Sequence, residues 1–373
     1  MIKSMIFHHP LPIRSEGTSG SQVRPFRMSK AFKQIGYQVE LVAGYADERK
    51  KTIERIKKDV LKGRKFEFIY SESLTNPMLL SEKYHFPTHP LLDFGFFKWL
   101  KKRGVPVGFF YRDAYWRFPE YNTQVPWHKR AVLVPFFWYD WLQYLHLVDH
   151  LFLPSLAMKE ILPSQWPDNR VSALPPGCNI SSLSKQHALK TSPPGLELLY
   201  VGGITPPFYD LTPTIEAVGS LDHVCLTVCC RASEWEKFRS YYTPIDSAKI
   251  RIVHTHGKEL EAYYATADIF VLVRSLHPFS VIAMPVKLFE ALGYGVPIVT
   301  SGGTEVAHFV EREGIGWIVS SQDEFRPLLS YLRVHPEETA DKQRRVRVVQ
   351  NRHTWVKRAQ MVAGTLTTAA DRN

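Results

Sequence analysis

The chain has 373 residues, a formal net charge of +11 and 13% aromatic residues. Domains usually hold about 100–200 residues, so this length favours two domains over one large domain. The ordinary shares of hydrophobic (45%) and charged (22%) residues exclude collagen-like, coiled-coil and globally disordered chains. A basic, aromatic-rich chain leaves nucleic acid, an anionic membrane or a phosphorylated substrate as candidate partners.

Strand-like and helix-like segments alternate along the first half of the chain. Pro25 fits only the first turn of a helix, and Gly36 ends that helix. The alternation indicates a parallel sheet with crossover helices. Apolar runs and amphipathic segments predict strands at 4–9, 37–45, 66–73, 105–113, 150–155 and 171–177, and helices at 24–36, 47–65 and 90–104.

The most apolar stretch is 131–148, which contains Pro135 and Asp140. If Pro135 opens a helix, about 14 residues remain, or roughly 20 Å at 1.5 Å per residue. A hydrocarbon core is about 30 Å thick, so we expect a buried or surface-lying helix rather than a membrane span. The N-terminus has neither the long apolar region nor the cleavage site of a signal peptide.

A second alternating series follows residues 176–195, whose Pro, Gly and Ser residues predict a linker. The four cysteines of the chain form neither a disulfide framework nor a zinc-binding spacing, which indicates a reducing, cytosolic compartment. We predict strands at 196–203, 223–230, 249–257, 268–274, 296–303 and 314–321, helices at 210–221, 258–267 and 286–295, and a basic, mostly helical segment at 337–370.

The densest set of candidate binding residues lies in 284–304, MPVKLFEALGYGVPIVTSGGT. Lys287 and Glu290 are three residues apart and share one face of the predicted helix. Lysine offers a point charge for phosphate, and glutamate offers a bidentate acceptor for a vicinal diol such as ribose. The alternative, which spacing alone favours, is an exposed Lys–Glu pair without a ligand.

This segment, P-x-K-x-F-E-A-x-x-x-G-x-P-I-V followed by T-E-V-A, resembles the donor-binding segment of retaining glycosyltransferases of family 4. LLYVGGI, ELEAYYATADIFVLVRS, VDHLFLPSLAMKEIL and LPPGCN are similar to other parts of that family, so the resemblance covers most of 105–361. It implies an α/β GT-B fold, in which two Rossmann-like parallel-sheet domains face across a cleft. Residues 1–175 would form the acceptor domain, 196–340 the nucleotide-sugar domain, and 341–373 a helix that crosses back to the first domain.

The resemblance implies roles for residues of the donor segment. Glu290 would bind the donor ribose and Lys287 would lie near the diphosphate. Backbone N–H groups of 278–284 and 302–304, including that of Thr304, would cradle phosphate or sugar. His277 is a candidate to contact the sugar, with a packed loop histidine as the alternative.

The sequence departs from the family at its phosphate clamp. Ile282 stands where the family usually has a second Glu, and Gly203-Ile204 stands where it has Gly-Arg; the Lys that usually follows is also missing. Arg231 and Arg274 follow predicted strands and are candidates to replace the missing charge. The alternative for each is a surface ion pair.

Candidate residues also occur in the first domain. Arg112 and Asp113 end a predicted strand, where the family often has a His or Asp near the reactive carbon of the sugar; a simple Arg–Asp pair is the alternative. Gly17 and Gly20 would permit close backbone approach on the acceptor side, and Arg24 would add charge there, with a plain flexible loop as the alternative.

No D-x-D motif occurs, which fits a metal-independent scheme without a cofactor beyond the nucleotide sugar. Positive side chains and helix dipoles would then stabilise the leaving diphosphate. The family implies retention of anomeric configuration. The sequence thus predicts a glycosyltransferase that moves a sugar from a nucleotide-diphosphate sugar to a glycan or lipid-linked acceptor in surface polysaccharide or glycoconjugate synthesis. The alternatives are a catalytically silent GT-B scaffold and a GT-B sugar-nucleotide epimerase.

The charge is unevenly divided along the chain. Residues 1–175 hold 26 Lys and Arg against 16 Asp and Glu, whereas residues 176–373 hold 21 against 20. Basic residues beside Trp and Phe suit an anionic membrane surface, so we expect a cytoplasmic protein that is peripheral on the inner face of the plasma membrane. The alternative is a solvated charged surface over an aromatic core. Nucleic acid is not an expected partner, because no recognition module is present.

Overall fold

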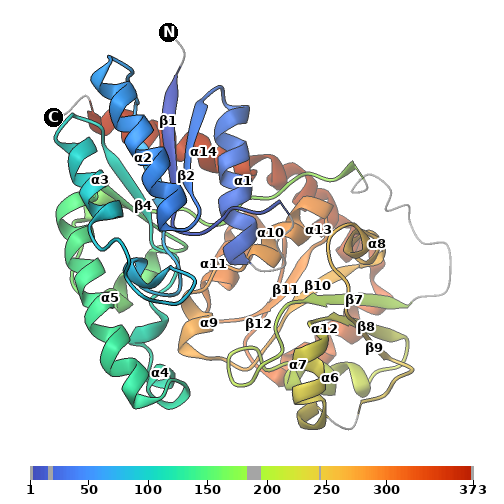
Figure 1. The fold of residues 1–373 in the computed structure, drawn as a ribbon. Helices are drawn as coiled ribbons and strands as arrows, with labels where there is room; N and C mark the ends of the chain where they lie inside the picture. The colour runs from blue at the N-terminus through green and yellow to red at the C-terminus, as the bar shows by residue number, and fades with distance from the viewer. Residues whose placement is uncertain (1–2, 16–19, 183–194, 243–244, 371–373) are drawn as a thin grey trace. The chain divides into compact units, whose positions relative to one another are not determined.

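The computed structural model describes residues 3–15, 20–182, 195–242 and 245–370. Its contacts divide the chain into two compact units. Unit 1 comprises Met1–Pro175 together with Trp355–Asn373, and unit 2 comprises Pro176–Thr354. Each unit contains a six-stranded sheet, and every strand pairing that defines these sheets is parallel (Figure 1).

The sheet of unit 1 has the strand order β2-β1-β3-β4-β5-β6. Because β1 lies inside the sheet and the chain first moves to one side and then to the other, the order is that of a doubly wound sheet. Its strands are β1 (Ser4–His9), β2 (Gln38–Ala43), β3 (Ile69–Glu72), β4 (Val107–Phe110), β5 (His150–Leu153) and β6 (Val171–Ala173).

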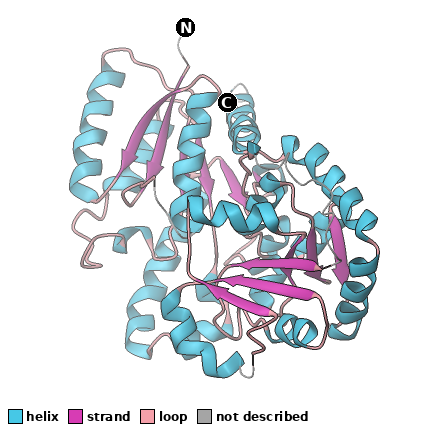
Figure 2. Cartoon of the chain, turned by 90° about the vertical axis from the view of Figure 1, so that its right-hand side faces the viewer, coloured by secondary structure: helices cyan, strands magenta, loops and turns pink. Residues whose placement is uncertain are grey.

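Helices flank this sheet (Figure 2). They are α1 (Gly20–Gln34), α2 (Ala46–Leu61), α3 (Leu92–Lys101), α4 (Pro119–Gln124), α5 (Trp127–Leu147) and α14 (Trp355–Ala370), with short 3₁₀ segments η1 (Met78–Leu80), η2 (Tyr115–Arg117), η3 (Leu156–Ile161) and η4 (Asp168–Arg170).

The last helix, α14, completes the core of the first unit. Trp355, Val362 and Leu366 belong to the same buried cluster as Phe7 of β1 and Phe32 of α1. Gly108 on β4 makes room for it, since a Cβ there would lie 2.6 Å from Leu366 Cδ1. Unit 1 is therefore built from both ends of the chain.

The sheet of unit 2 has the order β12-β11-β10-β7-β8-β9, which is again doubly wound. Its strands are β7 (Leu196–Val201), β8 (Val224–Cys229), β9 (Ile250–Val253), β10 (Ile269–Leu272), β11 (Ile298–Ser301) and β12 (Gly316–Val319). Its helices are α6 (Thr212–Gly219), α7 (Ala232–Phe238), α8 (Lys258–Thr266), α9 (Pro278–Ile282), α10 (Val286–Tyr294), α11 (Glu305–Glu313), α12 (Gln322–Val334) and α13 (Pro336–Val349), with 3₁₀ segments η6 (Arg239–Tyr242) and η7 (Gln350–Arg352).

All twelve predicted strands occur in the structure, but two predictions about proline are wrong. Helix α1 begins at Gly20, so Pro25 lies beyond its first turn. Helix α5 begins at Trp127, so Pro135 lies inside a helix of 21 residues instead of opening one. In each helix the proline removes one backbone hydrogen bond, and the helix continues past it with buried side chains that follow, such as Met28 in α1 and Trp141 in α5.

Most of the predicted linker 176–195, namely residues 183–194, lies outside the described residues. The part before this gap forms a single parallel bridge between Cys178 and Thr354. Among the described residues, no helix combines the length and the apolar character that a membrane crossing needs.

Candidate active site

The carboxyl ends of β7, β8, β10 and β11 bring most candidate residues of unit 2 to one edge of its sheet. These strands are neighbours and parallel, so the segments that follow them emerge on the same side. Gly203, Arg231 and Arg274 each lie two residues after a strand, and Thr304 lies three residues after β11. In open parallel sheets, this is the edge at which ligands bind.

Lys287 and Glu290 face each other on α10. The Lys287 Nζ atom donates to Glu290 Oε2 at 2.7 Å, and the hydroxyl of Tyr264 on α8 also donates to Oε2, at 3.4 Å. Both charged side chains are 27% exposed. Gly295, with a φ of +80°, ends the helix in the left-handed conformation. The structure therefore holds a partly exposed carboxylate in a fixed orientation in the middle of α10.

The loop after β7 is held by hydrogen bonds to other residues of unit 2. The Tyr200 hydroxyl donates to the Gly203 carbonyl at 2.5 Å, and the Ile204 N–H donates to Glu234 Oε2 at 3.1 Å. A Cβ at Gly203 would lie 3.2 Å from the Tyr209 ring. The short loop thus presents backbone, rather than a positive side chain, at the position where the family that the sequence resembles has Gly-Arg.

The two candidate arginines differ in their surroundings. Arg231 is exposed and pairs with Glu234 at 2.8 Å, the arrangement given above as its alternative. Arg274 is half-buried, and its guanidinium lies 5.4 Å from the Tyr209 ring centroid. Its backbone is fixed by Ser301, whose Oγ accepts from the Arg274 N–H and donates to its carbonyl, both at 3.0 Å. Arg274 is the better placed of the two to meet an anion at the sheet edge.

His277 is 6% exposed and caps the short helix α9. Its Nδ1 accepts from the Phe279 N–H at 3.1 Å, and its ring packs against Phe208 at 4.5 Å between centroids. This tautomer leaves the proton on Nε2. His277 therefore orders the segment that follows β10.

Thr304 uses its hydroxyl to cap α11. The Oγ1 atom accepts from the Ala307 N–H at 3.0 Å and donates to the Ser301 carbonyl at 3.1 Å. Gly303 before it has a φ of +69°, a conformation that glycine adopts without strain. Because the first N–H groups of a helix have no partner within the helix, the start of α11 offers backbone donors to an anion.

In unit 1, Arg112 and Asp113 pair at the end of β4. The Arg112 Nε atom lies 3.1 Å from Asp113 Oδ2, and Thr75 contacts both side chains. The Ser73 Oγ accepts from the Arg112 N–H at 2.9 Å. The two side chains are 20% and 17% exposed, so the pair remains open to a ligand.

Arg24 lies in the interior rather than on the surface. It is 3% exposed, its guanidinium is 3.5 Å from the Phe110 ring centroid, and its Nε lies 3.3 Å from Glu72 Oε1. Gly20 is the first residue of α1, and Gly17 lies outside the described residues. Arg24 therefore neutralises a buried carboxylate at the end of β3.

A buried polar cluster in unit 1 was not predicted. His8 lies 2.9 Å from Asp93 and 2.8 Å from Ser71, and Arg49 donates to both oxygens of Asp93 at 2.9 Å. Burial lowers the pKa of His8, although the contact with Asp93 acts in the opposite direction. The order Ser–His–Asp is that of a nucleophilic triad, but Ser71 and His8 are 0% exposed. The cluster therefore holds β1, β3 and α3 together.

Asp140 is a second unpredicted feature of unit 1. It is 3% exposed, and Asp113 lines the same small cavity of about 10 Å³. Burial raises the pKa of Asp140 to about 8, although the Met78 N–H donates to its Oδ2 at 2.5 Å. Its Oδ1 has no hydrogen-bond partner among the described residues. The only sequence signal was an aspartate inside an apolar helix.

Within the described ranges, no three His, Cys, Asp or Glu side chains are grouped as metal ligands. The metal-independent scheme stays a prediction. The positive groups at this edge of the second sheet include Lys287, Arg274 and the start of α11, whereas Arg231 is paired with Glu234.

Residues 213–364 match the family model described as "Glycosyl transferase-like". A comparison with curated protein sequences finds no match. The matched segment includes α10, with Lys287 and Glu290, and the start of α11. The family match, together with the two doubly wound sheets, supports a glycosyltransferase as the class of this protein.

Solved structures similar to the whole chain support the GT-B fold. HepE of Anabaena, solved in complex with UDP-glucose, is 13% identical with a TM-score of 0.63, over 98% of this chain and 99% of that chain. WaaG, a glycosyltransferase involved in lipopolysaccharide biosynthesis, is 14% identical with a TM-score of 0.57, over 98% and 100%. A UDP-forming α,α-trehalose-phosphate synthase from Burkholderia vietnamiensis is 12% identical with a TM-score of 0.62, over 100% and 98%.

Proposed function

We propose that this protein transfers a sugar, with retention of anomeric configuration, from a nucleotide-diphosphate sugar to a glycan or lipid-linked acceptor in surface polysaccharide or glycoconjugate synthesis. The observation that carries the proposal is the Lys287–Glu290 pair on α10. A fixed, partly exposed carboxylate accepts two hydroxyl hydrogen bonds from a ribose, and a lysine beside it offers positive charge to a diphosphate.

The donor side of the proposal rests on unit 2. HepE has been solved with UDP-glucose, and the trehalose-phosphate synthase is described as UDP-forming. A uridine diphosphate sugar is therefore the first donor to test. Lys287, Arg274 and the N–H groups at the start of α11 would stabilise the negative charge that develops on the leaving diphosphate.

The acceptor side of the proposal rests on unit 1. Arg112 and Asp113 are open to a ligand, and residues 1–175 carry a formal charge of +10. A positive surface favours an acceptor with its own negative charge, such as a sugar on a lipid diphosphate. We accordingly expect the protein in the cytoplasm, where nucleotide sugars are the donors.

The test is the variant Glu290→Gln, with Glu311→Gln on the exposed side of α11 as the matched control. Titration calorimetry with UDP, GDP and dTDP measures donor binding, and nuclear magnetic resonance of the product measures anomeric configuration. Loss of charge-assisted hydrogen bonds should weaken binding of the preferred nucleotide at least about tenfold in Glu290→Gln and leave the control unchanged. Equal binding by both variants and the native protein would contradict the assignment of Glu290.

A catalytically silent binding protein is the second candidate. Ile282 and the Gly203–Ile204 loop favour it. At these positions the family that the sequence resembles has a glutamate and an arginine, which this chain lacks. Nucleotide binding without release of nucleoside diphosphate, with any of the acceptors offered, would support this candidate over the transferase.

A further inference from the structure

Helix α5 of unit 1 places its polar and apolar side chains in an unusual way. It buries Asp140 and exposes Trp127, Val132 and Leu142, which are 74%, 54% and 51% exposed. Its inner face also buries Trp141, Tyr144 and Leu147, as a surface helix normally does, but a solvated outer face usually carries charged or polar side chains rather than large apolar ones. The outer face of α5 is therefore suited to a medium other than water.

The exposed apolar side chains follow one face of the helix. Val132, Pro135, Trp138 and Leu142 are spaced by three and four residues, and His146 continues this line one turn further on. At 1.5 Å per residue, the helix of 21 residues is about 31 Å long. The face is thus a continuous strip rather than a set of single exposed residues.

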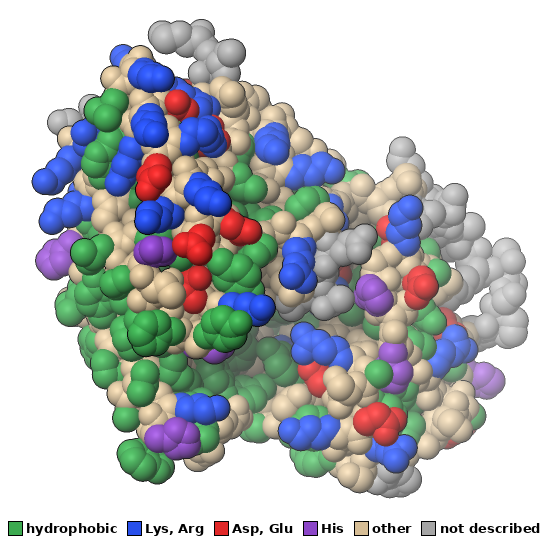
Figure 3. Space-filling view, viewed as in Figure 1, with side chains coloured by type: hydrophobic (Ala, Val, Ile, Leu, Met, Phe, Trp, Pro, Cys, Tyr) green, Lys and Arg blue, Asp and Glu red, His purple; other side chains and the backbone are tan. Residues whose placement is uncertain are grey.

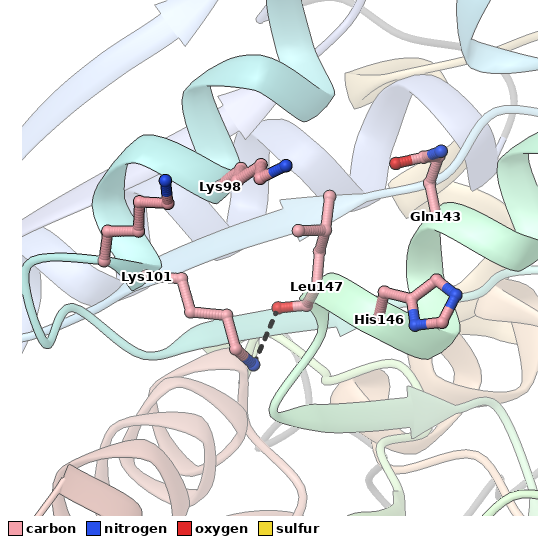
Figure 4. Close-up of a pocket in the computed structure, with 6 residues that line it drawn as sticks. Lys98, Lys101, Gln143, His146 and Leu147 are labelled. Atoms are coloured by element: carbon pink, nitrogen blue, oxygen red, sulfur yellow. Dashed lines mark hydrogen bonds between the residues drawn. The ribbon is translucent and has the colours of Figure 1, made fainter.

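One end of this strip is positively charged. The ends of α3 and α5 line a cavity of about 530 Å³ formed by Lys98, Lys101, Lys102, Gln143, His146 and Leu147. Figure 4 shows lysines of α3 on one side and Gln143 and His146 of α5 on the other, with Lys101 bonded to the Leu147 carbonyl at 3.4 Å. Lys101 also pairs with Asp149.

Lys98 and Lys102 differ from Lys101. Both are exposed, and within the described part of the chain neither forms an ion pair. In Figure 3, hydrophobic side chains gather over α5, and Lys and Arg side chains lie next to them toward the end of α3. A ligand at the cavity would therefore meet two uncompensated charges.

We propose that the outer face of α5, together with the lysines at the end of α3, is a docking surface for an anionic lipid bilayer. Trp and Leu side chains enter the headgroup–acyl boundary, and lysines bind lipid phosphates. The excess positive charge of residues 1–175 complements such a surface and disfavours a basic protein partner. This inference does not depend on sugar transfer.

The test is flotation of the full chain with vesicles of phosphatidylcholine alone and of an equal mixture of phosphatidylcholine and phosphatidylglycerol. We expect binding to the mixed vesicles that weakens with salt. Lys98→Gln/Lys102→Gln should reduce partitioning roughly 25-fold, since each lysine near an anionic surface contributes about 1 kcal/mol, or roughly fivefold. Trp127→Ser/Leu142→Ser should reduce it by a similar factor.

The matched control is Lys237→Gln/Lys258→Gln, which removes the same charge from exposed positions of unit 2. Full binding by this control, with loss in the other two double variants, supports the proposal. Absence of binding to mixed vesicles at low ionic strength, or an equal loss in the control, would overturn it.

A dimer in size-exclusion chromatography that Trp127→Ser/Leu142→Ser dissociates would also overturn it, because a second copy would then occupy the face. Thermal melting of each variant reports on folding, and UDP binding tests the proposed function separately.

Discussion

The carboxyl group of Asp140 makes stability depend on pH in an uncommon direction. Its pKa is about 8 in the folded protein, because the group is buried, against about 3.8 in the unfolded chain. Between these values the folded protein holds a proton that the unfolded chain has released, so stability falls as pH rises. The slope that this one group contributes is about 1.4 kcal/mol per pH unit.

We therefore predict that Asp140→Asn stabilises the protein, by an amount that grows as pH rises from about 4 to about 8. Asparagine keeps an acceptor for the Met78 N–H and cannot ionise. Urea unfolding of native and variant protein at several pH values measures the difference. Asp168→Asn, at an exposed side chain, serves as control. A difference that is constant across this pH range would show that Asp140 is not protonated in the folded state.

At the scale of elements, a proline inside α5 lowers the stability of that helix. Pro135 lacks the N–H that would donate to the Ala131 carbonyl, and its ring crowds that carbonyl. Because Pro135 is exposed, its side chain contributes little buried surface in return. We predict that Pro135→Ala stabilises unit 1 by about 1–3 kcal/mol. Urea unfolding measures this value.

Pro126, which precedes the first residue of the same helix, is the matched control for Pro135. Pro126→Ala should not stabilise the protein, because an N-terminal proline interrupts no hydrogen bond within the helix. An unchanged or lower stability of Pro135→Ala would mean that the helix bends at this position to fit its neighbours, and that the bend is worth more than the lost hydrogen bond.

The elements that the sequence predicts well are those with strong local signals. The strands of both units are apolar runs bounded by turn residues, and Gly36 and Gly295 mark helix ends with φ of +93° and +80°. Helix α11 was not predicted, although Thr304 and Gly314 bracket it as caps. Short helices such as α7 and α9 depend on contacts made after folding, which local pattern does not contain.

The contacts of the candidate site also divide into those that local sequence predicts and those that depend on the fold. The Lys287–Glu290 contact follows from helical spacing alone. The burial of Arg24 against Glu72 could not be predicted, because it depends on where α1 begins and on how β3 and β4 lie beside it. Asp140 was visible as an aspartate in an apolar stretch, but only the fold shows that its side chain turns inward while Val132 and Leu142 face out.

At the scale of the whole molecule, the chain leaves unit 1 at Pro175 and returns to it at Trp355. Leu366 of α14 is 0% exposed in the core of unit 1, and Leu332 of α12 is 1% exposed in the core of unit 2. Truncation of a buried leucine to alanine lowers the free energy of unfolding by about 2–5 kcal/mol, and the unit whose core loses the side chain is the one destabilised. The two positions therefore report on the two units separately.

We predict that calorimetric unfolding resolves two transitions, of which Leu366→Ala lowers one and Leu332→Ala lowers the other. If UDP binds at α10, it should raise the temperature of only the transition that Leu332→Ala lowers. At a UDP concentration one hundred times its Kd, the free energy of unfolding of that unit should increase by about 2.7 kcal/mol. A single transition that both variants lower equally would contradict independent units. A rise in the transition that Leu366→Ala lowers would instead place nucleotide binding in unit 1, because a ligand stabilises only the folded unit to which it binds.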